Sequence, residues 1–216
     1  MSDPRDPRPH DALPAASADE QRALLREVDH RVKNNLQLIA SMILLQSRRA
    51  ADPAAHQALK TVLERVTAVA TVHRRLFQDD PLNFDVADFL HDLTSDMAGG
   101  AGRDDLQIAL ELDRVIIPAS SAAAFALVAN ELIGNALKHA FPPGRAGRVA
   151  VSLADRGDAC VFSVTDDGVG VADSPPGFGS TIVKLLCQQL RAELLVSEAG
   201  PGLRASVTLP VSQARS

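Results

Sequence analysis

Two long stretches at the start of the chain have the pattern of helices, and they constrain the fold more than any other feature. The first runs from about residue 18 to residue 50 without proline or glycine, and Asp52-Pro53 interrupts the pattern before the second continues to about Phe77. In both stretches apolar residues recur every three or four positions, on one face of a helix that turns about 100° per residue. They are Val28, Val32, Leu36, Ile39 and Ile43, then Leu59, Val62, Val66, Val69 and Leu76. The pattern predicts two antiparallel helices.

A hairpin of two such helices leaves part of each apolar stripe uncovered, because a pair of helices encloses no core of its own. The second stretch alternates three- and four-residue steps, which is the spacing of a coiled-coil seam. Pairing with a second copy covers both stripes. We therefore expect a homodimer in which two hairpins form a four-helix bundle.

The remainder of the chain mixes strand and helix patterns. Helices are predicted over 86–97, 119–140 and 180–190, and strands over 82–86, 106–112, 148–153, 159–165, 192–197 and 204–209, with a loop at 99–102. Residues 1–17 are rich in Pro, Asp, Arg and Ala and read as a disordered tail. The chain is thus predicted to be α+β, with a helical hairpin over 18–80 and an α/β sandwich over 81–216.

Composition narrows the classes of partner. The 216 residues carry a formal net charge of -5 and include no tryptophan or tyrosine, so nucleic acid is not an expected partner. No apolar run approaches the ~20 residues that span a bilayer, and no signal peptide is visible. The apolar surroundings of Cys160 and Cys187 favour buried thiols over a disulfide. We expect a cytoplasmic protein that does not enter a membrane.

His30 lies nearly opposite the apolar stripe of the first helix and is expected to face water or a docked domain. An imidazole with an ordinary pKa of about 6.5 is neutral enough at pH 7 to act as a nucleophile. The adjacent Asp29, and Glu27 one helical turn back, can fix its tautomer and accept the released proton. Arg31 and Lys33 can hold phosphate charge. Taken alone, the same residues also fit an idle histidine on a solvated helix face.

A second group of candidate residues lies on the predicted helix over 119–140. Glu131 and Asn135 are four residues apart and therefore share one helix face, and Lys138 follows on the same side. The carboxamide oxygen of Asn135 suits a magnesium ion. Lys138 and His139 are placed to approach phosphates. A polar stripe on an amphipathic helix is the alternative interpretation.

Two glycine motifs follow. Asp166-Asp167-Gly168-Val169-Gly170 comes directly after a strand, so the Asp166 carboxylate can accept a hydrogen bond from an adenine amino group while the glycines admit a ligand close to the backbone. Gly177-Phe178-Gly179-Ser180-Thr181 precedes a helix, whose free N–H groups suit phosphates. A plain turn and a helix cap formed by Ser180 are the alternatives. No GxxxxGK[ST] sequence is present, so a P-loop is not supported.

These motifs, in this order, resemble those of sensor histidine kinases over about residues 18 to 210. The segment of His30, Arg31 and Asn34-Asn35 is similar to the HWE-related subclass, and the later segments resemble the GHKL-type ATP-binding fold. The resemblance implies a dimerisation and phosphotransfer hairpin with His30 as phosphoacceptor, joined to a GHKL-type sandwich. It implies ATP and Mg²⁺ as cofactors, with Asn135 as the metal ligand and Glu131 as base or metal-associated acid.

The same resemblance implies further roles for the glycine motifs. Asp166 would contact adenine, Gly168 and Gly170 would shape the pocket, and Gly177 and Gly179 would close over the phosphates. The segment Val171 to Pro176 between the motifs is shorter than the usual ATP lid of the family. No sensory domain precedes the helices, so a separate sensor protein is an expected partner.

Three functions follow for comparison. The first is a two-component histidine kinase that phosphorylates His30 from ATP and passes the phosphoryl group to an aspartate of a response-regulator receiver domain. The second is a histidine phosphotransferase relay protein with a vestigial ATP-binding domain, which the short lid favours. The third is a GHKL partner of another kind, either a serine kinase of the anti-sigma type or a binding module. The histidines show no metal-ligand spacing such as HExxH.

Overall fold

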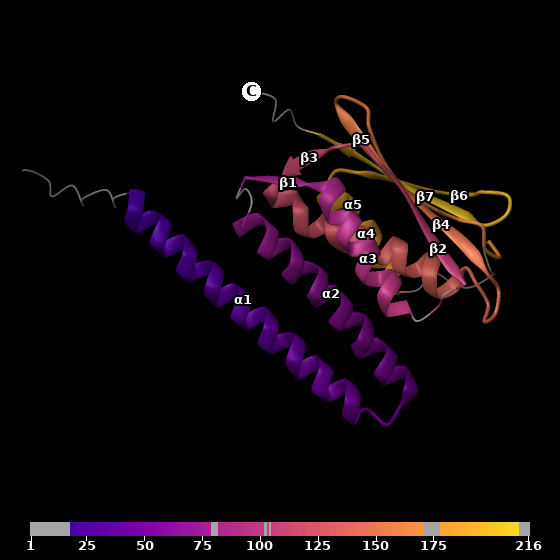
Figure 1. The fold of residues 1–216 in the computed structure, drawn as a ribbon, viewed down its shortest axis with the longest axis horizontal. Coiled ribbons are helices and arrows are strands. Elements are labelled where there is room, and N and C mark those ends of the chain that lie inside the picture. The colour runs from indigo at the N-terminus through magenta and orange to yellow at the C-terminus, as the bar shows by residue number, and fades with distance from the viewer. Residues whose placement is uncertain (1–17, 79–81, 102, 104, 171–177, 212–216) are drawn as a thin grey trace, which may run out of the picture.

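The computed structural model describes residues 18–78, 82–101, 103, 105–170 and 178–211. The tail expected over residues 1–17 lies outside the described residues. The described part forms a long helical hairpin that lies against an α/β sandwich (Figure 1). The predicted combination of a helical hairpin with a mixed sandwich is confirmed.

The hairpin consists of α1 (Ala18–Arg49) and α2 (Pro53–Gln78), packed side by side. Asp52 starts α2, because its carboxylate accepts hydrogen bonds from the backbone N–H groups of Ala54 at 3.1 Å and Ala55 at 3.4 Å. Pro53 is the first helical residue, where its missing N–H costs nothing. His56 Nδ1 lies 2.9 Å from the carbonyl oxygen of Ser47, which ties the two helices together near the turn.

The sandwich has one five-stranded sheet, in the order β2-β4-β5-β7-β6. Strands β2 and β4 are parallel, and the other neighbours are antiparallel. A small separate sheet pairs β1 with β3. Helices α3, α4 and α5 lie on one face of the large sheet, and α2 packs against α4 (Figure 1). The elements are β1 (Asn83–Asp85), α3 (Val86–Ala101), β2 (Leu106–Leu112), β3 (Ile116–Pro118), α4 (Ala119–His139), β4 (Gly147–Asp155), β5 (Ala159–Asp166), α5 (Phe178–Gln189), β6 (Glu193–Glu198) and β7 (Leu203–Pro210).

One local prediction was wrong, and one short strand was missed. The loop expected from residue 99 is helical, because α3 continues through Gly99 and Gly100 to Ala101. Each glycine lowers helix propensity by only about 1 kcal/mol relative to alanine, which the preceding packed turns of α3 offset. Strand β3 was not predicted, because three residues are too few to show alternation; it forms by pairing with β1, Phe84 opposite Ile117.

The core lies between α4 and the sheet. Phe125 of α4 and Phe162 of β5 are both fully buried, and their rings meet edge to face with centroids 5.3 Å apart. Alternate residues of β4 point into the same core, namely Val149, Val151 and Leu153. Because this core fixes α4 against β5, it also fixes the polar residues that α4 and the end of β5 carry.

Both cysteines are buried free thiols, which confirms the prediction made for them. Burial, assisted by the nearby charge of Asp155, raises the pKa of Cys160 to about 11, and burial also raises the pKa of Cys187. Both thiols therefore stay protonated and inert at neutral pH. Separately, no helix among the described residues is long and apolar enough to cross a membrane.

The Phe125→Ala substitution should lower the free energy of unfolding by about 3–5 kcal/mol, because it removes a buried ring and leaves a cavity beside Phe162. Leu195→Ala is the control, since this β6 side chain is 63% exposed, and it should change stability by less than about 0.5 kcal/mol. Urea denaturation of both variants measures the difference. Equal losses would show that the core is not centred on this aromatic pair.

Candidate active site

One side of α4 carries the polar residues of the candidate site. The helix forms readily because its sequence is rich in alanine and free of proline. The carboxylate of Glu131 is 94% buried, with an exposed fraction of 6%, whereas Asn135, one turn further, is exposed. The predicted neighbours Glu131 and Asn135 thus share a face, as their spacing requires.

The first turn of α5 lies directly against this pair. A Cβ atom placed on Gly179 would meet Glu131 Oε2 at 2.9 Å and Asn135 Oδ1 at 3.9 Å. Only glycine therefore fits at position 179 without displacing the Glu131 carboxylate. The helix begins at Phe178, so Ser180 lies inside its first turn rather than before it. Gly177 lies outside the described residues.

Asp166 ends β5 and is buried. Its Oδ1 accepts hydrogen bonds from the backbone N–H groups of Gly168 at 3.0 Å and Leu203 at 3.3 Å. A Cβ on Gly202 would lie 1.9 Å from the Asp166 carbonyl oxygen. Gly202 is therefore part of the support of Asp166, and it was missed from the sequence, where Gly200-Pro201-Gly202 indicated only a hairpin turn.

The loop after Asp166 packs against the C-terminal end of α4. A Cβ on Gly168 would meet the Ala140 carbonyl oxygen at 2.3 Å, and the N–H of Val169 donates to the same oxygen at 3.0 Å. Gly170 has a φ of +75°, a conformation that favours glycine. The structure thus brings the Asp166 motif to the C-terminal end of the helix that carries Glu131 and Asn135. His139 lies exposed in the last turn of that helix.

Helix α2 reaches into the same region with residues that the sequence did not single out. Arg65 Nε and Nη2 donate to Glu131 Oε1 and Oε2 at 2.7 and 2.8 Å, a two-bonded ion pair. The hydrogen bonds to Glu131 raise the pKa of Arg65 above its ordinary value, against the opposing effect of burial. Lys138 Nζ pairs with Glu64 Oε2 at 2.5 Å. No local pattern around residues 64 and 65 indicates these contacts, because their partners lie more than sixty positions away.

The predicted phosphoacceptor lies elsewhere. His30 is in the helical part of α1, and its side chain and that of Asp29 lie outside the described residues. Glu27 forms an exposed ion pair with Arg31, whose Nε lies 2.7 Å from Glu27 Oε1. Helix α2 separates α1 from the sandwich (Figure 1). The structure therefore groups the α4, α5 and β5 residues and leaves His30 apart from them.

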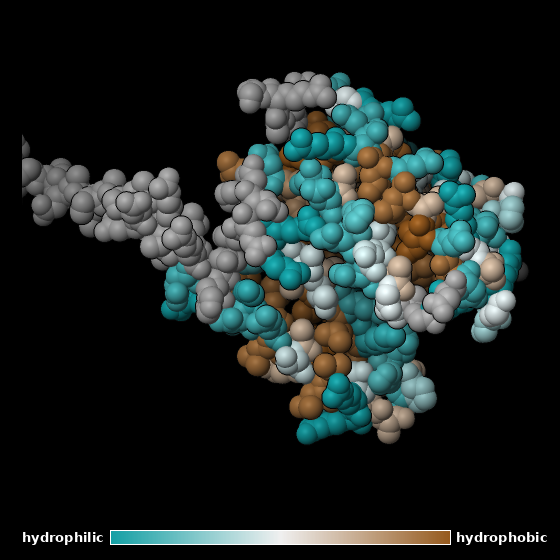
Figure 2. All heavy atoms as spheres, in the orientation of Figure 1, coloured by the Kyte–Doolittle hydropathy of each residue, from teal (hydrophilic) through white to brown (hydrophobic). Residues whose placement is uncertain are grey.

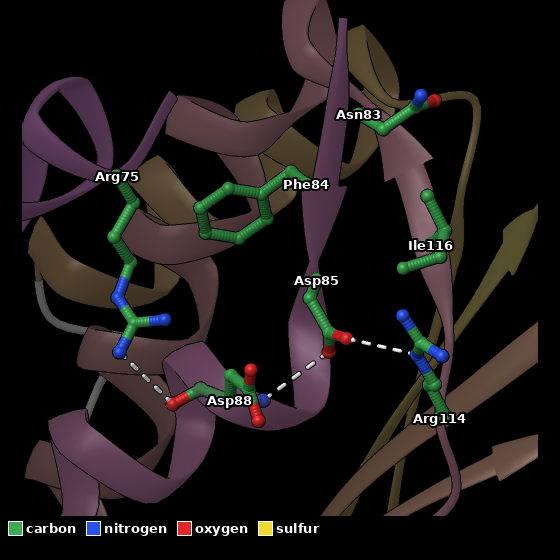
Figure 3. Close-up of a pocket in the computed structure, with 7 residues that line it drawn as sticks. All are labelled: Arg75, Asn83, Phe84, Asp85, Asp88, Arg114 and Ile116. Atoms are coloured by element: carbon green, nitrogen blue, oxygen red, sulfur yellow. Dashed lines mark hydrogen bonds and ion pairs between the residues drawn. The ribbon is translucent and has the colours of Figure 1, made fainter. Parts of the chain in front are cut away.

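A cavity of about 250 Å³ lies near the C-terminal end of α2, where this helix meets β1 and α3 (Figure 3). Arg75 from α2 donates to the carbonyl oxygen of Asp88 at 3.3 Å and forms an ion pair with Asp92. Asp85 caps α3 through the N–H of Ala87 at 3.0 Å. None of the predicted site residues lines this cavity, which marks the junction between the hairpin and the sandwich.

The described residues thus form a helical hairpin followed by a sandwich, and the sandwich gathers an acid, a carboxamide, an aspartate and close-packed glycines around one helix. This arrangement is that of a nucleotide-binding module joined to a helical hairpin. Residues 27–100 match the HisKA_2 family model, described as histidine kinase. Residues 121–213 match the model of the histidine kinase-, DNA gyrase B- and HSP90-like ATPases.

Individual relatives agree with the family models. Blue-light-activated histidine kinase 2 of Erythrobacter litoralis is 30% identical over 200 residues, which are 88% of this chain and 57% of that protein. Sensor histidine kinase PdtaS of Mycobacterium tuberculosis is 34% identical over 164 residues, 72% of this chain and 31% of that protein. The solved histidine kinase domain of the Erythrobacter litoralis EL346 blue-light activated histidine kinase is 30% identical with a TM-score of 0.65, and the match covers 91% of this chain and 94% of that one.

The chain belongs to the histidine kinase family, and the subclass expected from the segment around His30 is confirmed. Its second part is an ATP-binding domain of the type shared with DNA gyrase B and HSP90. The chain spans between about a third and somewhat more than half of the length of the two curated relatives described above.

The residues present fit ATP with a magnesium ion. Asn135 offers an exposed carboxamide oxygen, and Mg²⁺ is usually held by one or two protein oxygens together with phosphates. The close approach of Gly179 leaves backbone rather than a side chain beside that oxygen. Among the described residues no cluster of three His, Cys, Asp or Glu side chains forms a metal site by itself. Any ion here would therefore depend on the nucleotide phosphates for most of its ligands.

Gly168→Ala should weaken ATP binding by at least about tenfold, because its Cβ would overlap the Ala140 carbonyl oxygen and push the Asp166 loop away from α4. Gly99→Ala is the matched control, since a Cβ there meets nothing within 4 Å. Calorimetric titration with Mg-ATP measures the affinity, and circular dichroism checks the fold. Wild-type affinity in a folded Gly168→Ala protein would show that this loop does not contribute to nucleotide binding.

Proposed function

We propose that this protein is an ATP-dependent protein-histidine kinase that phosphorylates His30 and then transfers the phosphoryl group to an aspartate of a response-regulator receiver domain. The observation that supports it most is the convergence of Glu131, Asn135 and the α5 backbone at Gly179. The relay alternative needs none of this close packing. The family membership of both halves of the chain supports the same assignment.

In this proposal each side chain has a limited task. ATP would supply the γ-phosphoryl group, and Asn135 would hold a magnesium ion, which would supply positive charge to offset that of the phosphates. Asp166 accepts a hydrogen bond from the adenine amino group, and Gly168 and Gly170 leave room for the base. The N-terminus of α5, at Gly179 and Ser180, directs N–H groups at the phosphates, and Lys138 and His139 add positive charge. Gly177, which the resemblance also assigns to the phosphates, lies outside the described residues. Glu131 acts as a base or as a metal-associated acid.

The imidazole of His30 is the nucleophile. One ring nitrogen attacks the γ-phosphorus, an N–P bond forms, and the bond to the β-phosphate oxygen breaks to release ADP. The second ring nitrogen loses its proton to an acidic neighbour, Asp29 or Glu27, which also fixes the tautomer. The receiver aspartate then attacks the phosphorus, the N–P bond breaks, and the proton held by the acidic neighbour returns to the imidazole, so that an aspartyl phosphate and neutral His30 are formed.

Purified protein incubated with Mg-ATP labelled at the γ-phosphate should gain an acid-labile label, because phosphohistidine hydrolyses in acid. His30→Ala should abolish the label by removing the nucleophile. Asn135→Ala should lower the labelling rate by at least about a hundredfold, since positioning of the metal and phosphates supplies most of the catalysis of phosphoryl transfer. Filter-bound radioactivity after neutral and acid washes measures the outcome.

Gln37→Ala serves as the matched control, because Gln37 is an exposed polar residue on the same helix as His30, and it should label at the wild-type rate. Absence of label on the wild type, combined with phosphorylation of His30 by a phosphorylated receiver domain, would reject the kinase and establish the relay protein. Label that survives in His30→Ala would reject the acceptor assignment.

We also propose that two copies pair through the hairpin. Leu38, Met42 and Leu45 are 55%, 53% and 51% exposed, and their spacing places them on one face of α1. Figure 2 shows hydrophobic residues gathered over the lower part of the molecule, where the hairpin lies. This stripe is distinct from the one formed by Leu36 and Ile43, which are half-buried. A second hairpin would cover it.

Met42→Glu should convert the dimer to a monomer, because it places a charge in the centre of the apolar stripe. Gln37→Glu introduces the same charge on the polar side of α1 and should leave the dimer intact. Size-exclusion chromatography with light scattering gives the mass of each species. A monomeric wild type at micromolar concentration would contradict the pairing.

A further inference from the structure

The contact between α2 and α4 involves two residues of the candidate nucleotide site, Glu131 and Lys138. Both oxygens of Glu131 accept hydrogen bonds from Arg65, and the ammonium group of Lys138 is paired with Glu64. The two residues of α2 are neighbours in sequence, and their partners on α4 are two helical turns apart. The hairpin therefore meets the ATP-binding domain at the candidate site and not at an unrelated surface.

A carboxylate whose two oxygens both accept hydrogen bonds from a guanidinium must break those bonds before it can accept a proton or bind a metal ion. A lysine held by a glutamate is likewise less available to phosphates. We propose that Glu64 and Arg65 of α2 form an autoinhibitory latch on the candidate active site, which must open before the site can act. This inference rests on the proposed kinase function and assigns the regulation of the same site.

The two ion pairs contribute unequally to the stability of the closed latch. The side chains of Arg65 and Glu131 are 14% and 6% exposed, whereas those of Lys138 and Glu64 are 36% and 28% exposed. Solvent screens the second pair more strongly. Removing one partner of a buried pair leaves the other charge unsatisfied, which disfavours the closed contact. Arg65 is therefore the principal residue of the latch, and Glu64 assists it.

The position of His30 agrees with a closed, inactive arrangement. The helices of the hairpin run antiparallel from the contact of Ser47 with His56. Counting along both helices from that contact places His30 level with about His73, roughly 12 Å along the axis from Arg65 at about 1.5 Å per residue. His30 is also on α1, and α2 lies between α1 and the sandwich (Figure 1). Transfer to His30 of the same chain thus requires the hairpin and the sandwich to change their relative position.

A third contact provides a matched control. Arg75 lies further along α2 and pairs with Asp92 of α3, next to the cavity shown in Figure 3. This pair also joins the hairpin to the sandwich, but it touches none of the candidate nucleotide residues. Loss of Arg75 should loosen the junction without freeing Glu131. A comparison of Arg65 with Arg75 therefore separates occupation of the site from general loosening.

The latch predicts the direction of coupling. A ligand shifts a conformational equilibrium by its differential affinity for the two states. If a nucleotide binds only the open state, the free energy needed to open the latch lowers its apparent affinity. Arg65→Gln should remove that penalty and tighten binding of a non-hydrolysable ATP analogue with Mg²⁺ by about tenfold, within the usual range for coupled sites. Glu64→Gln should tighten it by roughly twofold. Arg65→Lys, which keeps the charge but not the fork, should fall between wild type and Arg65→Gln.

Calorimetric titration of the full chain with the Mg-analogue complex measures these affinities, and labelling from γ-labelled Mg-ATP measures the rate. The expected result is tighter binding and faster labelling for Arg65→Gln and Glu64→Gln, with Arg75→Gln at the wild-type affinity. Unchanged or weaker binding in Glu64→Gln and in folded Arg65→Gln would overturn the latch. An equal gain in Arg75→Gln and Arg65→Gln would also overturn it, because that gain reports loosening of the junction alone.

Failure of the kinase proposal is distinguishable from failure of the latch. The binding measurement uses a nucleotide that cannot donate a phosphoryl group, so it reports the latch even in a protein that never labels His30. Tighter analogue binding in Arg65→Gln without any label on His30 would support the latch and reject the kinase. A wild type that labels His30, with unaltered binding in both variants of the latch, would support the kinase and reject the latch.

Discussion

Helix α4 meets two opposing demands, and the rest of the structure is arranged around them. One face, with Phe125 at its centre, is sealed against the sheet, and the other carries a carboxylate that is itself almost fully buried. A buried charge is tolerated only with a partner. The described structure supplies that partner from outside the sandwich, through Arg65 of α2. The position of the hairpin is therefore coupled to the electrostatics of the candidate site.

In the proposed kinase this coupling gives Glu131 two mutually exclusive roles. With both oxygens bound to Arg65 it serves as a structural anchor between the two parts of the chain. To act as a base or near a metal it must exchange that guanidinium for ligands of the nucleotide complex. The exchange avoids the large cost of a bare buried charge when a group of the nucleotide complex replaces Arg65 as the partner of the carboxylate. In the proposed latch, Glu131 therefore links nucleotide binding to the position of the hairpin.

The sequence predicted most of the elements, because their signals are local. The Asp52-Pro53 break marked the turn of the hairpin, and alternation marked β4 and β5. It also predicted that Glu131 and Asn135 share a face, which follows from helical spacing alone. It could not predict that Arg65 would meet Glu131, or that Gly202 would support Asp166, since both contacts join distant segments through the tertiary fold. The three-residue strand β3 was missed for a related reason, as it exists only by pairing with β1.

The glycines show how close packing and ligand binding are combined. Gly179 lies against Glu131 and Asn135, Gly168 against Ala140, and Gly202 against the Asp166 carbonyl oxygen. At positions 168 and 202 a Cβ would overlap the backbone of another segment, and at position 179 it would displace the end of the Glu131 side chain. The backbone at these glycines therefore lines the candidate site and also forms the packing contacts among α4, α5, β5 and the start of β7. A ligand bound beside these glycines would therefore contact the same backbone that packs against α4. Helix α4 is also the helix that α2 contacts through Arg65 and Glu64.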